Sequence, residues 1–209
     1  MKFVTILVTR SKSIHVKSLH SILRLNLKCL QVGGAQNEII YCNDNPYEKS
    51  ELIQAQIKRT EVDRLLFVDY GVHIDDESLA QAFEAHEGVG CIVFPAVREG
   101  IDWKMFKDNV KRESKEPVEQ MGLHFDTEVG KKISDGIHVV TSTEARCWVM
   151  MVKNARKRIE KVHPNPKIMF QKFRESGLKV HAWVRAKLTI TYTHECVSNI
   201  MNAAGVKTT

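Results

Sequence analysis

The sequence predicts an α/β fold in which a central mixed, mostly parallel sheet is flanked by helices. Two observations favour this class: short β-branched apolar runs alternate with segments of helical spacing, and polar turns separate them. Strands that alternate with helices of this length form parallel pairs through right-handed crossovers. A chain of 209 residues can also bury a conventional core without the help of disulfides or structural metals.

The first half of the chain repeats the alternation three times and then adds a fourth strand. We expect strands at Lys2–Thr9, Asn37–Cys42, Leu65–Val68 and Val89–Val97. We expect helices at 14–30, 47–60 and 76–86, the first of them followed by Gly33 and Gly34 as a stop signal.

The second half is less regular. More than half of the residues from Arg98 to Glu119 are charged, and because no apolar period survives there, we expect a surface loop. Beyond it we expect two short strands within 136–152, a basic helix at 153–161, a helix at 167–176 that Gly177 ends, and one or two strands within 180–192. Residues 1–195 are expected to form a single domain, and 196–209 a tail or linker.

Composition narrows the classes of partner and compartment. The five cysteines are odd in number, widely spaced and free of any CxxC pair, which argues against a disulfide framework and a zinc site and favours a reducing, cytoplasmic compartment. The apolar run Phe3–Val8 is too short for a signal peptide or a membrane span. A net charge of +6 fits an anionic partner: nucleotide phosphates, nucleic acid or an acidic lipid surface.

Polar side chains follow three of the expected strands, at the point where each strand ends. Thr9 and Arg10 end the first strand, Asn43 and Asp44 the second, and Asp69 follows the buried run of the third. The carboxyl ends of parallel strands share one edge of the sheet, and ligands bind at that edge in open α/β folds. Each residue alone is equally typical of an ordinary polar turn, so the convergence of the three ends carries the functional interpretation.

Other candidates are weaker. The glycine-rich phosphate loops G-x-G-x-x-G and G-x-x-x-x-G-K-[ST] are absent. The acids at 75–77 are expected at the start of a helix, where they cap it and complement its dipole. The basic helix at 153–161 lacks the interleaved aromatics of a single-stranded nucleic-acid platform, so no specific nucleic acid is expected. His194, after the last expected strand, is either structural or a metal ligand.

Taken in order, four segments resemble the GT-A fold of nucleotide-sugar-dependent glycosyltransferases. They are FVTILVTR, NEIIYCNDNPYEKS, DRLLFVDYGVHIDDESL, which contains the place of the family's DxD motif, and FRESGLKVHAWVRAKLTITYTH. Within that family the chain is most similar to the N-terminal glycosyltransferase domain of a chlorella-virus protein, which would place it in the host cytoplasm.

The resemblance implies a UDP-sugar donor across the carboxyl edge of the sheet, with Mn²⁺ or Mg²⁺ bridging its diphosphate. By position, it implies a role in binding the nucleotide for Thr9, Arg10, Asn43, Asp44, Arg59 and Asp69. Asp69 stands at the first place of DxD, and His194 at the place of the family's late metal ligand. The metal is therefore expected on Asp69 and His194.

The chain departs from the family pattern in two places. Gly71 occupies the third place of DxD, so either Asp69 with His194 suffices, or the metal site is weak, or another side chain replaces the carboxylate: His73, Asp75 or Asp76. An acidic pair that often opens the late helix is replaced by Pro164–Lys167, which removes the carboxylate base of an inverting mechanism. Glu144 is the expected substitute, with Asp126 and Asp135 as rivals.

These features predict a glycosyltransferase that moves a hexose or deoxyhexose from a UDP-sugar to a glycan or glycoprotein acceptor. A nucleotidyltransferase uses a related sheet but needs a glycine-rich loop after the first strand, and TRSKSIH has no glycine. A scaffold that has lost the chemistry and binds nucleotide or another anionic partner is the non-enzyme alternative, favoured by Gly71 and the missing acidic pair.

Overall fold

The computed structural model describes residues 1–84, 86–97, 101–115, 118, 121–186 and 188–190. The chain divides into two compact units. Unit 1 comprises Met1–Ala96 and Asp126–Thr189, and unit 2 comprises Val97–Phe125 and Ile190–Thr209.

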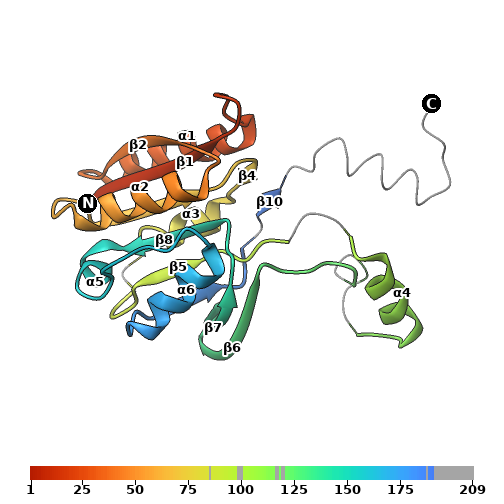
Figure 1. The fold of residues 1–209 in the computed structure, drawn as a ribbon. Helices are drawn as coiled ribbons and strands as arrows, with labels where there is room; N and C mark the ends of the chain where they lie inside the picture. Colours follow the sequence, from red (N-terminus) through yellow and green to blue (C-terminus); the bar gives the residue numbers. More distant parts are fainter. Residues whose placement is uncertain (85, 98–100, 116–117, 119–120, 187, 191–209) are drawn as a thin grey trace. The chain divides into compact units, whose positions relative to one another are not determined.

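Unit 1 is built on an 8-stranded sheet with the strand order β2-β1-β3-β8-β5-β9-β7-β6 (Figure 1). The strands are β1 (Lys2–Thr9), β2 (Gln36–Asn43), β3 (Arg64–Val68), β5 (Cys91–Val93), β6 (Thr127–Ser134), β7 (Ile137–Thr143), β8 (Cys147–Met151) and β9 (Val180–Trp183). Two shorter strands are β4 (Val72–His73) and β10 (Thr189–Ile190). The helices of this unit are α1 (Val16–Val32), α2 (Pro46–Lys58), α3 (Asp76–Gln81), α5 (Val152–Arg156) and α6 (Pro166–Glu175).

The sheet is mixed. Strand β1 pairs in parallel with β2 on one side and with β3 on the other, and β5 pairs in parallel with β9. Strand β8 lies antiparallel between β3 and β5, and β7 pairs antiparallel with both β6 and β9. The antiparallel β8 begins beside the carboxyl end of β3, where Cys147 pairs with Val68.

The core lies on both faces of the sheet, as the alternation of side chains along each strand requires. On one face Val4, Ile6 and Val8 of β1 pack in a cluster that includes residues of α2, α5 and α6. On the other face Phe3 and Leu7 pack in a cluster that includes residues of α1 and α3. The predicted α/β class, with helices on both sides of a mixed sheet, is confirmed. The expectation that the sheet is mostly parallel is wrong, because three of its described strand pairs are parallel and four are antiparallel.

The element predictions have mixed outcomes. Strand β1 has the predicted bounds, the other strands and helices expected up to residue 68 are present with shifted ends, and the two short strands expected within 136–152 are β7 and β8. Helices α3 and α5 end earlier than expected, at Gln81 and Arg156. Strand β6 was not expected, because its seven residues after Thr127 are all exposed and carry no apolar alternation.

The surface loop expected over Arg98–Glu119 is wrong for part of the segment. Unit 2 contains helix α4 (Trp103–Lys111), whose N-cap Asp102 accepts a 2.8 Å hydrogen bond from the backbone N–H of Met105. Trp103, Phe106 and Val110 recur at helical spacing among the charged residues. In the described part of the chain, none of the helices is both long and apolar enough to cross a membrane.

Candidate functional site at the carboxyl edge of the sheet

Three strand ends meet at one edge of unit 1, as the sequence predicts. Thr9 pairs with Asn43 at the ends of β1 and β2, and its hydroxyl donates to the carbonyl of Cys42 over 3.1 Å. Asp69 directly follows β3, and its backbone N–H donates to the carbonyl of Arg146 over 2.9 Å. Parallel pairing therefore brings residues from distant parts of the sequence to one place.

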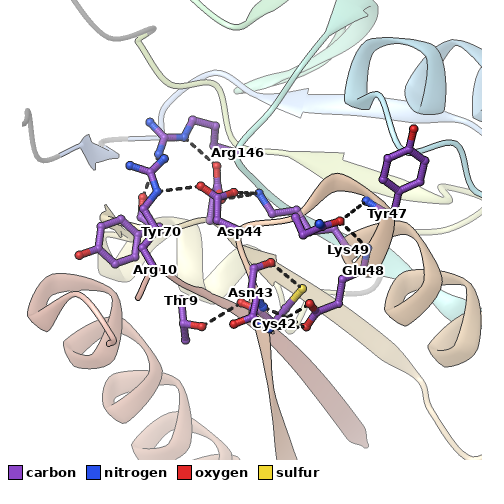
Figure 2. Close-up of polar contacts among 12 residues, drawn as sticks. Thr9, Arg10, Cys42, Asn43, Asp44, Tyr47, Glu48, Lys49, Tyr70 and Arg146 are labelled. Atoms are coloured by element: carbon purple, nitrogen blue, oxygen red, sulfur yellow. Dashed lines mark hydrogen bonds and ion pairs between the residues drawn. The ribbon is translucent and has the colours of Figure 1, made fainter. Parts of the chain in front are cut away.

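Five charged side chains at this edge form a chain of ion pairs, which we call the carboxyl-edge cluster: Arg10, Asp44, Lys49, Asp69 and Arg146. Figure 2 labels Arg10, Asp44, Lys49 and Arg146. Asp44 accepts from Arg10 Nε over 2.7 Å and from Lys49 Nζ over 2.5 Å. Asp69 accepts from Lys49 Nζ over 3.2 Å and from Arg146 Nε over 3.0 Å. Basic and acidic groups thus alternate along these four ion pairs.

The cluster is closed on one side and open on the other. The side chains of Lys49, Asp69 and Arg146 are only 16–18% exposed, whereas those of Asp44 and Arg10 are 30% and 42% exposed. Burial acts to raise the pKa of Asp44, but the hydrogen bonds from Lys49 and Arg10 outweigh it and lower the pKa. Asp44 is therefore an ionised counter-ion at neutral pH.

Tyr70 organises the two arginines. The guanidinium of Arg10 lies 5.0 Å from the centroid of the Tyr70 ring, within the range of a cation–π contact. Arg146 donates from Nη2 to the backbone carbonyl of Tyr70 over 2.8 Å. Both guanidinium groups are consequently held at the turn that follows β3.

The start of α2 orients Asn43. Glu48 accepts from the backbone N–H of Asn43 over 3.0 Å and from its Nδ2 over 3.0 Å. These hydrogen bonds, the backbone one first, lower the pKa of Glu48. The Asn45 side chain caps the helix by accepting from the N–H groups of Tyr47 and Glu48, and Pro46 stands in its first turn. The same turn carries Lys49 into the cluster.

A cavity of about 420 Å³ opens beside these strand ends, lined by Thr9, Lys12, Ile14, Tyr41 and Asn43. Its rim includes a tight turn after β1, in which Arg10 and Ser13 exchange backbone hydrogen bonds of 3.2 and 2.9 Å. Ser11 and Lys12 at the centre of that turn have φ of 49° and 59°, an unusual conformation for residues other than glycine. Strained backbone of this kind clusters at binding sites.

Arg59 does not join this group. It follows the last residue of α2, near the amino ends of the strands, and its guanidinium is held by Glu38 at 2.8 Å and by Glu61 at 2.7 Å. The structure therefore does not support the expected contact of Arg59 with a nucleotide at the carboxyl edge. The length of α2 is the reason, because its 13 residues separate the carboxyl end of β2, where the helix begins, from Arg59, which follows its last residue.

The three candidate carboxylates lie in different surroundings. Glu144 lies in the connection between β7 and β8, two residues before Arg146, and its backbone N–H donates to the carbonyl of Asp126 over 2.8 Å. Asp126 is buried and accepts from the backbone N–H of Ala96 and from the Thr127 hydroxyl, and burial raises its pKa. Asp135 lies in the exposed β6–β7 turn and pairs with Arg185. Of the three carboxylates, Glu144 is partly exposed and is the nearest in sequence to a residue of the cluster, Arg146.

Gly71 explains the missing DxD carboxylate in physical terms. The backbone N–H of Val72 donates to the carbonyl of Asp69, which closes a four-residue turn, and Gly71 at its third position has φ of 77°. Turns with positive φ at this position favour glycine. The backbone of this turn therefore favours glycine at the place where the resemblance led us to expect a second acid.

The proposed replacements for that acid are engaged elsewhere. His73 stacks on His20 of α1 with ring centroids 5.7 Å apart, Asp75 caps α3 by accepting from Ser78, and Asp76 pairs with Arg24. Among the described residues, no group of three or more His, Cys, Asp and Glu side chains could hold a metal ion. The described donors around Asp69 do not fit a divalent cation, since both carboxylate oxygens accept from cations. His194 lies outside the described residues, so its pairing with Asp69 stays a prediction.

Sequence reasoning missed Lys49, Tyr70 and Arg146. Lys49 could have been found as a basic residue in the first turn of a helix that starts at the second strand end. Arg146 could not, because only the insertion of β8 beside β3 brings it to Asp69.

The fold, but not the sequence, resembles known proteins. No family model and no curated protein sequence matches this chain. A solved structure of A197 from STIV matches with a TM-score of 0.54 and 10% identity, covering 92% of this chain and 87% of that one. This likeness shows a shared fold.

Two further solved structures match, and the description of the first names an enzyme. CMP:2-keto-3-deoxy-manno-octonic acid synthetase in complex with CTP matches with a TM-score of 0.49 and 8% identity, covering 98% of this chain and 99% of that one. HddC from Yersinia pseudotuberculosis matches with a TM-score of 0.49 and 9% identity, covering 98% and 100%. None of these three descriptions names a chlorella virus.

Proposed function

We propose that this protein is a glycosyltransferase that moves a hexose or deoxyhexose from a UDP-sugar to a glycan or glycoprotein acceptor. The observation that carries the proposal is the convergence of Thr9, Asn43 and the carboxyl-edge cluster at one edge of the sheet, beside a cavity of about 420 Å³. Ligands of open α/β sheets bind at this edge. The cavity is large enough to hold part of a nucleoside, and the cluster supplies donors for phosphate oxygens.

Transfer would form a bond between an acceptor hydroxyl oxygen and the anomeric carbon of the sugar. The bond from that carbon to the diphosphate oxygen would break, and UDP would leave with the electron pair. Lys49 and Arg146 would stabilise the negative charge that develops on the departing diphosphate. Glu144 would accept the proton of the acceptor hydroxyl, the role of a general base.

The test is UDP release from a panel of UDP-hexoses and UDP-deoxyhexoses, with UDP binding measured separately by calorimetry. We expect release with at least one donor, and a loss in kcat of roughly 100-fold or more for Glu144→Gln with little change in donor KM. Glu160→Gln, at an exposed position just after α5, is the matched control and should be unaffected. Absence of both UDP binding and UDP release would overturn the proposal.

A binding scaffold without transfer is the second candidate. It is favoured by the mutual neutralisation inside the cluster, where the oxygens of Asp44 and Asp69 are already occupied by cations. UDP binding with no release from any donor, and with Glu144→Gln equal to the wild type, would support it over the enzyme.

A further inference from the structure

The carboxyl-edge cluster gathers several basic side chains at one place. Its cations are Arg10, Lys49 and Arg146, and its carboxylates are Asp44 and Asp69. Lys12 adds a further cation where it lines the neighbouring cavity, and Glu48 adds an acid beside Asn43. An anion that entered this edge would therefore meet several charged donors.

The cations are fixed in place before any ligand binds. Arg146 donates from Nε to Asp69 and from Nη2 to the carbonyl of Tyr70, so its planar fork has a set orientation. Lys49 forms ion pairs with both Asp44 and Asp69. Cations that are already ordered lose little further freedom when they bind phosphate, which favours affinity.

The same contacts disfavour a divalent cation on Asp69. Its Oδ1 accepts from Lys49 and its Oδ2 from Arg146, and a metal would have to displace both cations and then lie beside them. Mn²⁺ and Mg²⁺ require several oxygen ligands, and Gly71 provides none from its side chain. The donor set resembles a phosphate site more than a metal site.

We propose that Lys49 and Arg146, assisted by Arg10, bind the diphosphate of a nucleoside diphosphate directly, in place of a divalent cation. The choice of nucleotide rests on the proposed function, whereas the anion binding rests on the cluster itself. Asp44 and Asp69 serve as internal counter-ions that hold the cations in the empty site and yield them to phosphate oxygens. Binding is then independent of Mn²⁺ and Mg²⁺.

Calorimetric titration of UDP into the full chain, once with EDTA and once with Mn²⁺, tests this directly. We expect the two Kd values to agree within about threefold. Lys49→Met should weaken binding at least tenfold in both buffers, because it removes a charge-assisted hydrogen bond to the diphosphate. Lys58→Met, at the other end of the same helix, is the matched control and should bind as the wild type does.

The change in UDP affinity caused by Asp69→Asn distinguishes a counter-ion from a metal ligand. If Asp69 is a counter-ion, removal of its charge leaves UDP affinity equal or higher, because a competitor for Lys49 and Arg146 is weakened. If Asp69 is a metal ligand, affinity in Mn²⁺ falls. Thermal melting followed by circular dichroism shows whether Asp69→Asn is folded. If it is not, Asp69→Glu is tested in its place; because this variant keeps the charge, it should bind UDP no more tightly than the wild type.

Failure of the metal-independent binding and failure of the proposed function give different results. Binding in Mn²⁺ but not in EDTA would overturn metal-independent binding and leave the proposed function standing. Loss of UDP binding in both buffers would overturn the proposed function as well, and pyrophosphate in EDTA then tests the cluster as an anion site by itself. Pyrophosphate that fails to bind would overturn the cluster proposal too.

A different observation concerns helix α1, which is apolar on two opposite faces. One face packs in the core through Ile22, Leu25 and Cys29. The opposite face exposes a second apolar stripe, which we call the α1 stripe: Val16, Leu19, Leu23, Leu27 and Leu30. Leu23, Leu27 and Leu30 are 53%, 58% and 77% exposed, which is unusual for leucines that recur on one helix face.

Charge beside the stripe indicates what could cover it. At 100° per residue, Lys17 and Lys28 fall together on one flank of the α1 stripe. A cavity of about 450 Å³ adjoins its start and is lined by Val16, Lys17, His20 and His73. A two-fold pairing with a second copy in antiparallel orientation would bring the two lysine flanks together, which is unfavourable. An anionic lipid surface would meet leucines with acyl chains and lysines with headgroups.

We infer that the α1 stripe docks on an anionic membrane surface. Co-sedimentation with phosphatidylcholine vesicles, with and without phosphatidylserine, tests this. We expect binding that needs phosphatidylserine and falls at least tenfold in the double variant Leu23→Gln with Leu27→Gln, while UDP binding is unchanged. Ile133→Gln, at a half-exposed apolar site of β6, is the matched control. No vesicle binding, or a dimer in solution that the double variant disperses, would overturn the inference.

Discussion

The two ends of strands β1 to β3 carry charged clusters of different design. At the amino ends, Lys2, Glu38, Arg59 and Glu61 form pairs of 2.7–3.9 Å with two cations against two carboxylates and side chains 28–50% exposed. At the carboxyl ends, three cations face two carboxylates, and three of the five side chains are under 20% exposed. A solvated cluster contributes little beyond surface stability, whereas a more enclosed one holds its cations in a fixed arrangement that a ligand can use.

The largest expected effect is on nucleotide binding. Arg146→Met should weaken UDP binding about 10- to 100-fold, because it removes charge-assisted donors from an enclosed site. Arg59→Met, the counterpart at the amino ends, should leave UDP affinity unchanged. Calorimetry in EDTA measures both. Equal losses in the two variants would remove the functional distinction between the two edges and restore the role expected of Arg59 from the sequence.

The turn between the cluster and β4 gives the next effect. Gly71→Ala should lower the free energy of unfolding by about 1–2 kcal/mol, because its φ of 77° is strained for a residue with a Cβ. An added Cβ would meet no atom within 4 Å, so no clash is expected beyond the strain. Urea denaturation checks this. An unchanged midpoint would show that the turn relaxes and that glycine is not required there.

Asp44 gives a smaller effect that depends on pH. Its pKa in the folded protein is lower than its ordinary value of 3.8, so its ion pairs stabilise the fold above that pH and cease to do so as the pH falls through the lowered pKa. Asp44→Asn should therefore cost about 1 kcal/mol or less at pH 6 and progressively less below pH 4, in view of partial exposure. Thermal melting of both proteins from pH 6 to pH 3 measures the difference. A constant difference across this range would contradict the assignment.

The smallest effect is expected at the amino ends. Glu38→Gln should cost less than about 1 kcal/mol, because solvent screens its pairs with Lys2 and Arg59. Raising the salt concentration should remove most of that cost. Urea titrations at low and high salt provide the measurement. A large cost that salt does not reduce would mean that solvent does not screen these ion pairs and that they stabilise the fold as buried pairs do.

Part of the site follows from local sequence. The strand ends at Thr9, Asn43 and Asp69 were predictable because buried apolar runs stop there, and parallel pairing then sets them on one edge. Gly71 was visible as a departure from a two-acid motif, although the turn that requires it appears only in the structure.

The rest depends on long-range order. Strand β8 is inserted antiparallel between β3 and β5, and no local pattern reports which strands pair, so Arg146 was not assigned to Asp69. Helix α4 and strand β6 were not expected because both are rich in charge and have few or no buried side chains; in β6 no apolar alternation remains, and in α4 the helical spacing of Trp103, Phe106 and Val110 was overlooked among the charges. His194 and the tail at 196–209 lie outside the described residues.

The central claim is that the carboxyl-edge cluster binds a nucleoside diphosphate through its own cations. A crystal structure of the full chain with UDP, grown in EDTA and then soaked with Mn²⁺, tests it most directly. We expect diphosphate oxygens within hydrogen-bonding distance of Lys49 Nζ and the Arg146 guanidinium, with no change after the soak. A diphosphate bound away from both side chains, or one that appears only after the soak with Mn²⁺ between it and Asp69, would contradict the claim.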